Sequence, residues 1–265
     1  MQTLVYAHFA KVEGEHWWFV ARRRFLRGLF ERHLHLPRGE GRALDIGCGT
    51  GGTLPLLSEF FAKCTGIDFA PEALALAREN WPGFTFELAD VNRLEGLGST
   101  EKWDGVTCLS VLYHRFVENV DGSLRGIHNL LKPGGLAAFN EPAFSILRRE
   151  HDQQVYGARR FRRDKFEASL RAAGFEIVES SYFNLWAFLP SLVLALVDRC
   201  RGARAEASTC VQELNVPFQW LNQLLVGWMR VEQWWAERVL SLPLGVSIII
   251  LARRPLSPAT TDKPR

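Results

Sequence analysis

The sequence lacks the features that mark secreted, membrane-spanning and metal-binding chains. Its five cysteines are scattered and form neither a C-x-x-C pair nor a Cys/His cluster, so we expect no disulfide framework and no bound metal. The longest apolar stretch, residues 182–197, is short for a membrane span. The first eleven residues contain no basic segment followed by an apolar one, so we expect no signal peptide. These absences predict a cytoplasmic protein in a reducing compartment.

The sequence also has little excess of charge of either sign. Its 32 Lys and Arg against 29 Asp and Glu give a formal net charge of +3, which does not favour a nucleic-acid partner. With 265 residues, of which 47% are apolar, the chain can bury a large core, and one α/β domain with an insertion is the leading expectation. We divide it into an N-terminal helical lid (1–40), a core (41–183 and 244–254), a Trp/Leu-rich helical insertion (184–243) and a flexible tail (255–265).

Short apolar runs alternate with helical stretches through the core. The predicted strands are 43–46, 64–67, 84–88, 105–111, 136–140, 175–183 and 245–252. The predicted helices are 71–80, 119–131 and 163–173, with helix-compatible residues also from the first glycine-rich turn through Phe61. Repeated β–α units predict a parallel sheet with helices on both faces. In such sheets a ligand lies beyond the carboxyl ends of the strands.

A glycine-rich motif follows the first predicted strand. The segment LDIGCGTGG (44–52) places glycines at 47, 49 and 52, the G-x-G-x-x-G pattern that lets a ligand approach the backbone closely. Asp68 ends the second strand 19 residues after Gly49, where an acidic side chain bonds ribose hydroxyls. These residues alone fit NAD as well as another adenosine cofactor.

Three further features resemble the class I S-adenosylmethionine-dependent methyltransferases: Asp45 before the glycines, Asp90 after the third strand, and the segment KPGG (132–135), expected as a turn before the fifth. The resemblance covers 41–183 and the final strand. It implies a Rossmann-like α/β sheet of seven strands, the seventh antiparallel, with S-adenosylmethionine as cofactor. The implied cofactor residues are Asp45, Gly47, Cys48, Gly49, Asp68, Phe69, Asp90, Val91 and Leu109. As alternatives, Asp45 caps a turn, Asp68 caps a helix, Asp90 is a loop residue and Phe69 belongs to the core.

Methyl transfer depends chiefly on placing the acceptor in line with the methyl group. A hydroxyl acceptor can in addition use a general base, most often a histidine. Tyr113 and His114 follow the fourth strand and are expected at the mouth of the crevice, where His114 either acts as the base or positions the acceptor. His16 and His151 are further acid/base candidates.

Two other segments resemble one branch of these methyltransferases, whose genes often lie beside glycan, lipid or natural-product pathways. They are EHWWFVARRR (15–24) and the loop that carries His151, Asp152 and ARRF (158–161). The resemblance implies that the N-terminal helix covers the cofactor and that the loop lies near the acceptor. Trp17, Trp18, Arg22 and Arg160 are therefore predicted to contact the acceptor, Arg160 through a phosphate or carboxylate. Alternatively, the aromatic residues pack onto the sheet and the arginines form a solvated helix face.

About 60 residues separate the sixth and seventh strands and hold five of the nine tryptophans. Within 219–240, Leu221, Leu225, Trp228, Trp235 and Val239 share a helical stripe. Three hypotheses remain open for this insertion: a cap over an apolar acceptor pocket, a peripheral contact with the inner membrane face, or a homodimer interface. The first two imply a hydrophobic or lipid-linked acceptor.

The sequence thus predicts S-adenosylmethionine-dependent methyl transfer to a hydroxyl of an amphipathic small molecule, such as a natural product, a lipid or a lipid-linked glycan precursor. Two alternatives remain. One is an NAD-dependent oxidoreductase with the same glycine motif, although the chain has no evident Tyr-x-x-x-Lys pair for hydride transfer. The other is a non-catalytic cofactor-binding protein that docks to membranes.

Overall fold

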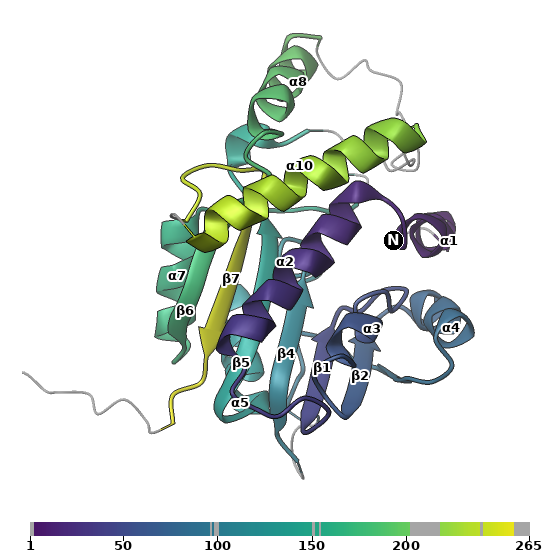
Figure 1. Cartoon of the computed structure of the whole chain (residues 1–265), viewed down its shortest axis with the longest axis vertical. Coiled ribbons are helices and arrows are strands. Elements are labelled where there is room, and N and C mark those ends of the chain that lie inside the picture. Colours follow the sequence, from purple (N-terminus) through teal and green to yellow (C-terminus); the bar gives the residue numbers. More distant parts are fainter. Residues whose placement is uncertain are drawn as a thin grey trace, which may run out of the picture.

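A seven-stranded sheet forms the centre of the molecule (Figure 1). The computed structural model describes residues 3–95, 97, 101–149, 152–153, 155–201, 218–238 and 241–256. The strands are β1 (Arg42–Ile46), β2 (Lys63–Asp68), β3 (Thr85–Leu88), β4 (Trp103–Leu109), β5 (Leu131–Pro142), β6 (Glu176–Phe183) and β7 (Ser247–Arg253). Their order is β3-β2-β1-β4-β5-β7-β6, and β7 runs antiparallel to both of its neighbours. This is the predicted Rossmann-like arrangement.

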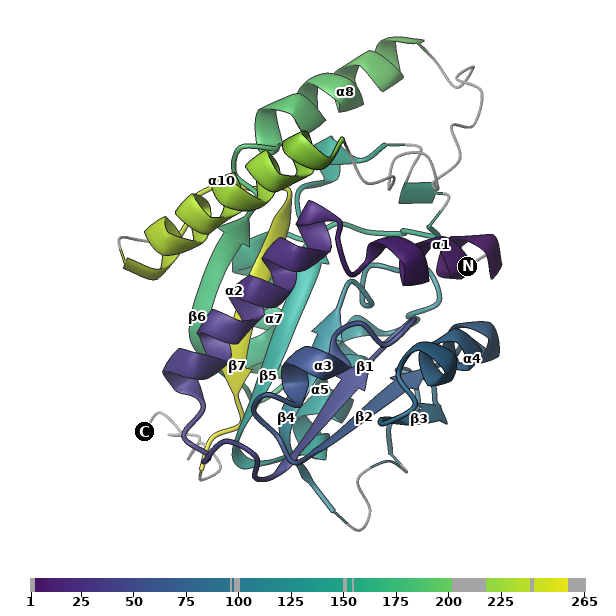
Figure 2. The same ribbon diagram turned by 45° about the vertical axis from the view of Figure 1, so that its right-hand side comes forward.

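Helices cover both faces of the sheet and enclose two apolar cores (Figure 2). On one face lie α2 (Trp17–His33), α3 (Leu54–Leu57) and α4 (Pro71–Asn80), and on the other lie α5 (Val120–Leu130) and α7 (Arg163–Ala172). The central strands β1, β4 and β7 are buried along almost their whole length because both faces are covered, as expected for such sheets. Pro71 begins α4, where its missing N–H costs nothing.

Two local predictions differ from the structure. The KPGG segment falls within β5 rather than before it, because the strand begins at Leu131 and not at residue 136. It is an irregular part of the strand, because Gly134 has a φ angle of 82° and the pairing with β4 shifts register between Leu131 and Leu136. Gly134 donates a backbone hydrogen bond to Arg254 and Gly135 accepts one from it, just beyond the end of β7. The helix expected through Phe61 is also shorter, because α3 ends at Leu57.

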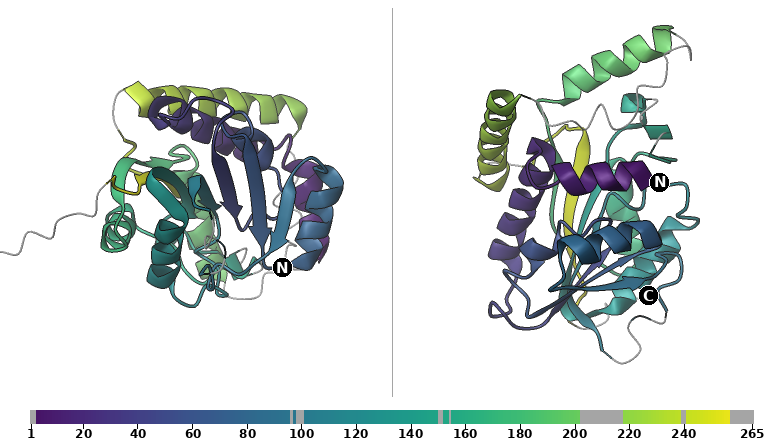
Figure 3. Two further views of the ribbon diagram at one scale, coloured as in Figure 1. Left: turned by 90° about the horizontal axis from the view of Figure 1, so that it is seen from below. Right: turned by 90° about the vertical axis from the view of Figure 1, so that its right-hand side faces the viewer.

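The N-terminal segment and the insertion lie at the carboxyl-end side of the sheet. Helix α1 (Thr3–Val12) packs against α4, and α2 follows it across the sheet. The described part of the insertion forms α8 (Phe188–Arg201), which contacts the short 3-10 helix η1 (Ser145–Leu147), and α10 (Gln219–Arg238), which packs on α2 (Figure 3). Within the described residues, no helix is both long and apolar enough to span a bilayer.

Candidate active site

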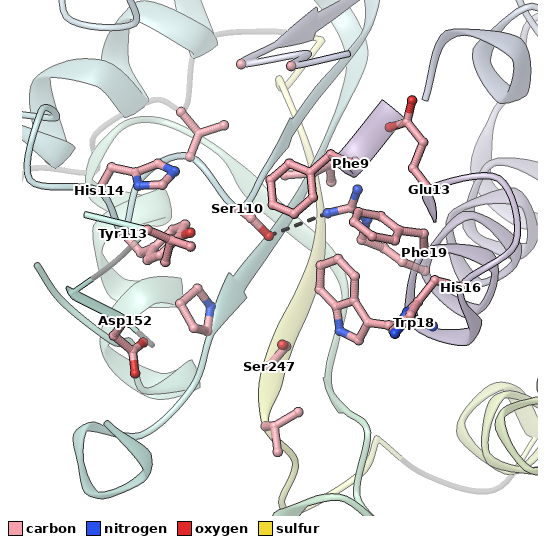
Figure 4. Close-up of a pocket in the computed structure, with 18 of the residues that line it drawn as sticks. Phe9, Glu13, His16, Trp18, Phe19, Ser110, Tyr113, His114, Asp152 and Ser247 are labelled. Carbon is pink, nitrogen blue, oxygen red and sulfur yellow. Dashed lines mark hydrogen bonds between the residues drawn. The ribbon is translucent and has the colours of Figure 1, made fainter. Parts of the chain in front are cut away.

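A cavity of about 450 Å³ opens beyond the carboxyl ends of β1, β2 and β4 (Figure 4). Its walls come from α1, α2, the turns after these strands, the end of β5, the start of β7 and α8. Most of the predicted site residues meet there. They are His16, Trp17, Trp18, Arg22, Gly47, Cys48, Gly49, Asp68, Phe69, Leu109, Tyr113, His114 and Arg160.

The glycine-rich turn forms the floor of the cavity. Gly47 and Gly49 have φ angles of 67° and 54°, the left-handed region that side chains disfavour. A Cβ at Gly47 would overlap the side chain of Val111, whereas a Cβ at Gly49 would meet no atom within 4 Å. The backbone at Gly49 is therefore open to a ligand on the cavity side.

Asp68 connects this turn to the end of β2. Its carboxylate accepts hydrogen bonds from the backbone N–H groups of Gly49 and Ala70, each at 2.9 Å. Burial raises the pKa of Asp68, and these backbone hydrogen bonds act in the opposite direction. Asp68 thus holds the turn in place and also borders the cavity, so the helix-capping and ligand-binding interpretations are compatible.

Three predicted cofactor residues lie outside the cavity lining. Asp45 is buried behind the glycine turn, where it accepts a hydrogen bond from Thr107 Oγ1 at 2.6 Å, and burial raises its pKa to about 7. Asp90 accepts hydrogen bonds from the backbone and side-chain nitrogens of Asn92, so it caps a local turn. Val91 is half-buried beside it.

Arg22 is a buried cation on the cavity wall. Its guanidinium lies 4.6 Å from the ring centroid of Trp18, and one of its nitrogens approaches Ser110 Oγ at 3.5 Å. Its Nε is buried without a hydrogen-bond partner, and no described carboxylate lies within ion-pair distance. Burial lowers its pKa to about 10, so it stays charged at neutral pH. A buried, incompletely satisfied guanidinium fits a bound carboxylate.

The turn after β4 is held by a residue that the sequence did not indicate. Glu141, near the end of β5, is buried and accepts hydrogen bonds from the backbone nitrogens of Val111, Leu112 and Tyr113 at 2.9–3.1 Å. Burial raises its pKa to about 8. These bonds fix the turn that presents Tyr113 and His114 to the cavity.

The histidines differ in their surroundings. The rings of Tyr113 and His114 lie 4.0 Å apart, and His114 Nδ1 is buried without a hydrogen-bond partner. His16 is the N-cap of α2, and its Nδ1 accepts a hydrogen bond from the backbone N–H of Trp18 at 3.3 Å. Burial lowers the pKa of both imidazoles to about 4, so both are neutral at pH 7. His151 lies outside the described residues.

The far wall of the cavity carries an ion pair. Arg160 binds the Asp152 carboxylate through two nitrogens at 3.0 Å and donates a third hydrogen bond to the carbonyl of Ala143. Arg160 therefore holds the loop after β5 against the strand, with its donors directed to protein acceptors. Within the described ranges, no group of three His, Cys, Asp or Glu side chains could hold a metal ion.

A seven-stranded sheet of this order, with a glycine turn and an acidic strand end around one cavity, defines a class I S-adenosylmethionine-dependent methyltransferase. Residues 18–180 match the profile of a family described as a methyltransferase domain. The chain belongs to this family, and methyltransferases of this fold use S-adenosylmethionine as their cofactor.

The relatives are quinone-pathway enzymes by name. The chain is 32% identical over 157 residues to a ubiquinone biosynthesis O-methyltransferase of Methylocella silvestris, covering 49% of this chain and 59% of that one. It is 34% identical over 107 residues to a demethylmenaquinone methyltransferase of Chlorobaculum tepidum, covering 39% and 41%. The matches thus span less than two thirds of these relatives.

Solved structures share the fold. An S-adenosylmethionine-dependent methyltransferase from Archaeoglobus fulgidus superposes with a TM-score of 0.54 at 17% identity, over 87% of this chain and 94% of that one.

Proposed function

We propose that this enzyme methylates a phenolic or enolic hydroxyl of an amphipathic acceptor. The observation that carries the proposal is the cavity itself, in which the Tyr113 side chain and the neutral His114 face aromatic and aliphatic walls. The apolar lining includes Phe9, Phe19, Leu147, Val155 and Val246. Such walls favour an acceptor with an apolar part.

Within this proposal, Arg22 and Asp68 bind opposite parts of the cofactor. Arg22 would pair with the methionine carboxylate, because it is a buried cation without an ion-pair partner among the described carboxylates. Asp68 would accept hydrogen bonds from the ribose, and Gly49 offers backbone open to close approach. Phe69, about half exposed at the rim, would cover the adenine. When bound, S-adenosylmethionine supplies an electrophilic methyl group on a sulfonium.

The acceptor would meet Tyr113 and His114. A histidine with a pKa of about 4 is neutral and accepts hydrogen bonds, but it is a weak base. Such a group orients a hydroxyl more effectively than it removes a proton from an alkyl alcohol. A phenol, with a pKa of about 10 in the tyrosine side chain, ionises far more easily than an alcohol. This difference favours an acidic hydroxyl as the acceptor.

The relatives agree with such an acceptor. They include enzymes named for O-methylation in ubiquinone biosynthesis, and the reduced form of a quinone carries phenolic hydroxyls.

A methyl-transfer assay with three acceptors tests the proposal. The acceptors are a catechol with a long alkyl tail, the same catechol without it, and a sugar alcohol, each with radiolabelled S-adenosylmethionine. We expect the tail to raise kcat/KM and the sugar alcohol to give no turnover. His114→Gln should lower kcat with the catechol while leaving the affinity for S-adenosylhomocysteine unchanged. Faster turnover of the sugar alcohol than of the catechols would refute the proposal.

A further inference from the structure

The outward face of α10 is apolar along its whole length. Trp220, Leu224, Trp228, Val231 and Trp235 recur at helical spacing, and each is between 49% and 66% exposed. Five large apolar side chains in one exposed stripe are far more than a solvated helix of a monomeric protein normally presents.

This exposure is not the result of loose packing, because polar anchors hold the inward face. Asn222 exchanges hydrogen bonds with the Trp17 N–H and the Glu15 carbonyl at the start of α2. Glu232, also buried, accepts hydrogen bonds from the backbone nitrogens of Asn184 and Leu185 at 2.6 and 2.9 Å. The orientation of α10 is therefore set by specific bonds that turn its tryptophans outward.

Helix α8 repeats the pattern next to the cavity. Four exposed apolar residues recur at helical spacing just before and along this helix: Leu185, Leu189, Val193 and Leu196. On the same helix, Ser191 lines the cavity. Both helices lie at the end of the molecule where the parallel strands terminate (Figure 3). The same helix thus carries part of the exposed apolar surface and part of the wall of the active site.

Arginines accompany the stripe in the part of α10 whose side chains are described. The exposed charged side chains described on α10 are Arg230 and Arg238, and Arg238 lies 5.4 Å from the ring centroid of Trp234. On α8 the described carboxylate, that of Asp198, is bonded to Arg149. Tryptophan and arginine side by side on an apolar helix suit the boundary between acyl chains and anionic headgroups.

We propose that the α8/α10 face, defined by the exposed residues Leu185, Leu189, Val193, Leu196, Trp220, Leu224, Trp228, Val231 and Trp235, docks onto an anionic lipid bilayer. The basic rim selects a membrane over a second copy of this chain, since two such faces would bring Arg230 and Arg238 of both copies into one apolar interface. Docking would place the cavity wall at Ser191 next to the acyl chains, so that an acceptor with an apolar tail could enter from the bilayer. Only this delivery role rests on the proposed function.

Vesicle co-sedimentation of the full chain tests the proposal. The vesicles contain phosphatidylcholine alone, or phosphatidylcholine and phosphatidylglycerol at roughly two to one. We expect binding to the anionic vesicles with a blue shift of tryptophan emission. Arg230→Gln/Arg238→Gln should weaken binding more than about tenfold, since one arginine at an anionic surface corresponds to about fivefold. Trp220→Ser/Trp228→Ser should weaken it by at least about tenfold.

The matched control is Leu256→Ser, which alters an exposed leucine at the opposite end of β7 and should leave vesicle binding unchanged. Equal loss in this control would overturn the proposal. Absence of binding of the wild-type chain to anionic vesicles would also overturn it. In that case, a dimeric mass by light scattering that becomes monomeric in Trp220→Ser/Trp228→Ser would assign the face to a second copy of the chain. Titration with S-adenosylhomocysteine separates the two proposals, because a variant that binds it normally but not vesicles supports docking independently of the acceptor class.

Discussion

Gly47 and Gly49 offer a paired test of how the cofactor turn works. Both have positive φ angles, so an alanine at either position should cost about 1–2 kcal/mol of the free energy of unfolding. Only at Gly47 would the new Cβ overlap Val111, a stiff β-branched side chain, and overpacking of this kind adds about 1–3 kcal/mol. Gly47→Ala should therefore be less stable than Gly49→Ala.

Cofactor binding should be more sensitive to the alanine at position 49. The Cβ of Gly49→Ala would enter open space on the cavity side, where a cofactor would approach the backbone. We expect this variant to remain folded while its affinity for S-adenosylhomocysteine falls about tenfold or more, equivalent to about 1.4 kcal/mol.

Urea unfolding and calorimetric titration measure these two effects separately. The double variant Gly47→Ala/Val111→Ala is the control, because it removes the overlap and should recover about 1–3 kcal/mol in a double-mutant cycle. Equal stability of Gly47→Ala and Gly49→Ala would refute the packing argument. Wild-type affinity in Gly49→Ala would show that the backbone at position 49 does not face the cofactor.

Three further predictions follow from buried polar groups. Arg22→Met should weaken S-adenosylhomocysteine about ten- to a hundredfold but leave adenosine, which has no carboxylate, within about twofold by calorimetry. Because the pKa of His16 is about 4 in the fold against 6.5 when unfolded, its contribution to stability is present above pH 6.5 and lost as the pH falls towards 4. His16→Asn keeps a capping acceptor but loses the titrating imidazole. Between pH 6.5 and 4, the free energy of unfolding of this variant, measured with urea, should therefore fall less steeply than that of the wild type, by up to about 1.4 kcal/mol per pH unit. Glu232→Gln should lower the free energy of unfolding by about 1–3 kcal/mol, and unchanged stability would contradict the anchoring role of its bonds to Asn184 and Leu185.

The sheet and the cofactor turn were predictable because their signals are local. A buried strand needs an apolar run, and a turn with positive φ angles needs glycine, so both appear in consecutive residues. The start of β5 was less predictable, because backbone bonds with Arg254, distant in the chain, draw Gly134 and Gly135 into the strand as an irregularity.

The fine structure of the site depends on contacts between distant residues. Glu141 was missed because its partners, Val111 to Tyr113, lie about 30 positions earlier in the chain. Asp90 lies where the rule places acidic strand ends, and only the structure shows that Asn92, two residues later, donates two hydrogen bonds to its Oδ1. A sequence pattern does not show which nearby donor will form a hydrogen bond with a given carboxylate.

The insertion shows the same limit more strongly. Helical spacing predicted a stripe through Leu221, Leu225, Trp228, Trp235 and Val239. Trp228 and Trp235 are exposed, Leu221 and Leu225 are half-buried, and Val239 lies outside the described residues. The two tryptophans face outward because Asn222 and Glu232 supply the buried bonds of the opposite face. Polar residues on the inward face are ordinarily evidence against burial. Here Asn222 and Glu232 are buried in place of apolar residues, because each forms hydrogen bonds with backbone groups that would otherwise lack partners.

These anchors also link the two surfaces on which the proposals rest. Asn222 of α10 bonds the N–H of Trp17, and the Trp17 ring lies 5.2 Å from that of Trp186 at the start of the insertion. On the same helix, Trp18, the next residue, and Arg22, five residues after Trp17, line the cavity. A rigid helix transmits a displacement of its first turn to the next, so a bilayer that holds α10 would also restrain the cofactor wall. Membrane docking should therefore tighten S-adenosylhomocysteine binding, and Asn222→Ala should abolish that coupling while each site alone still binds its ligand.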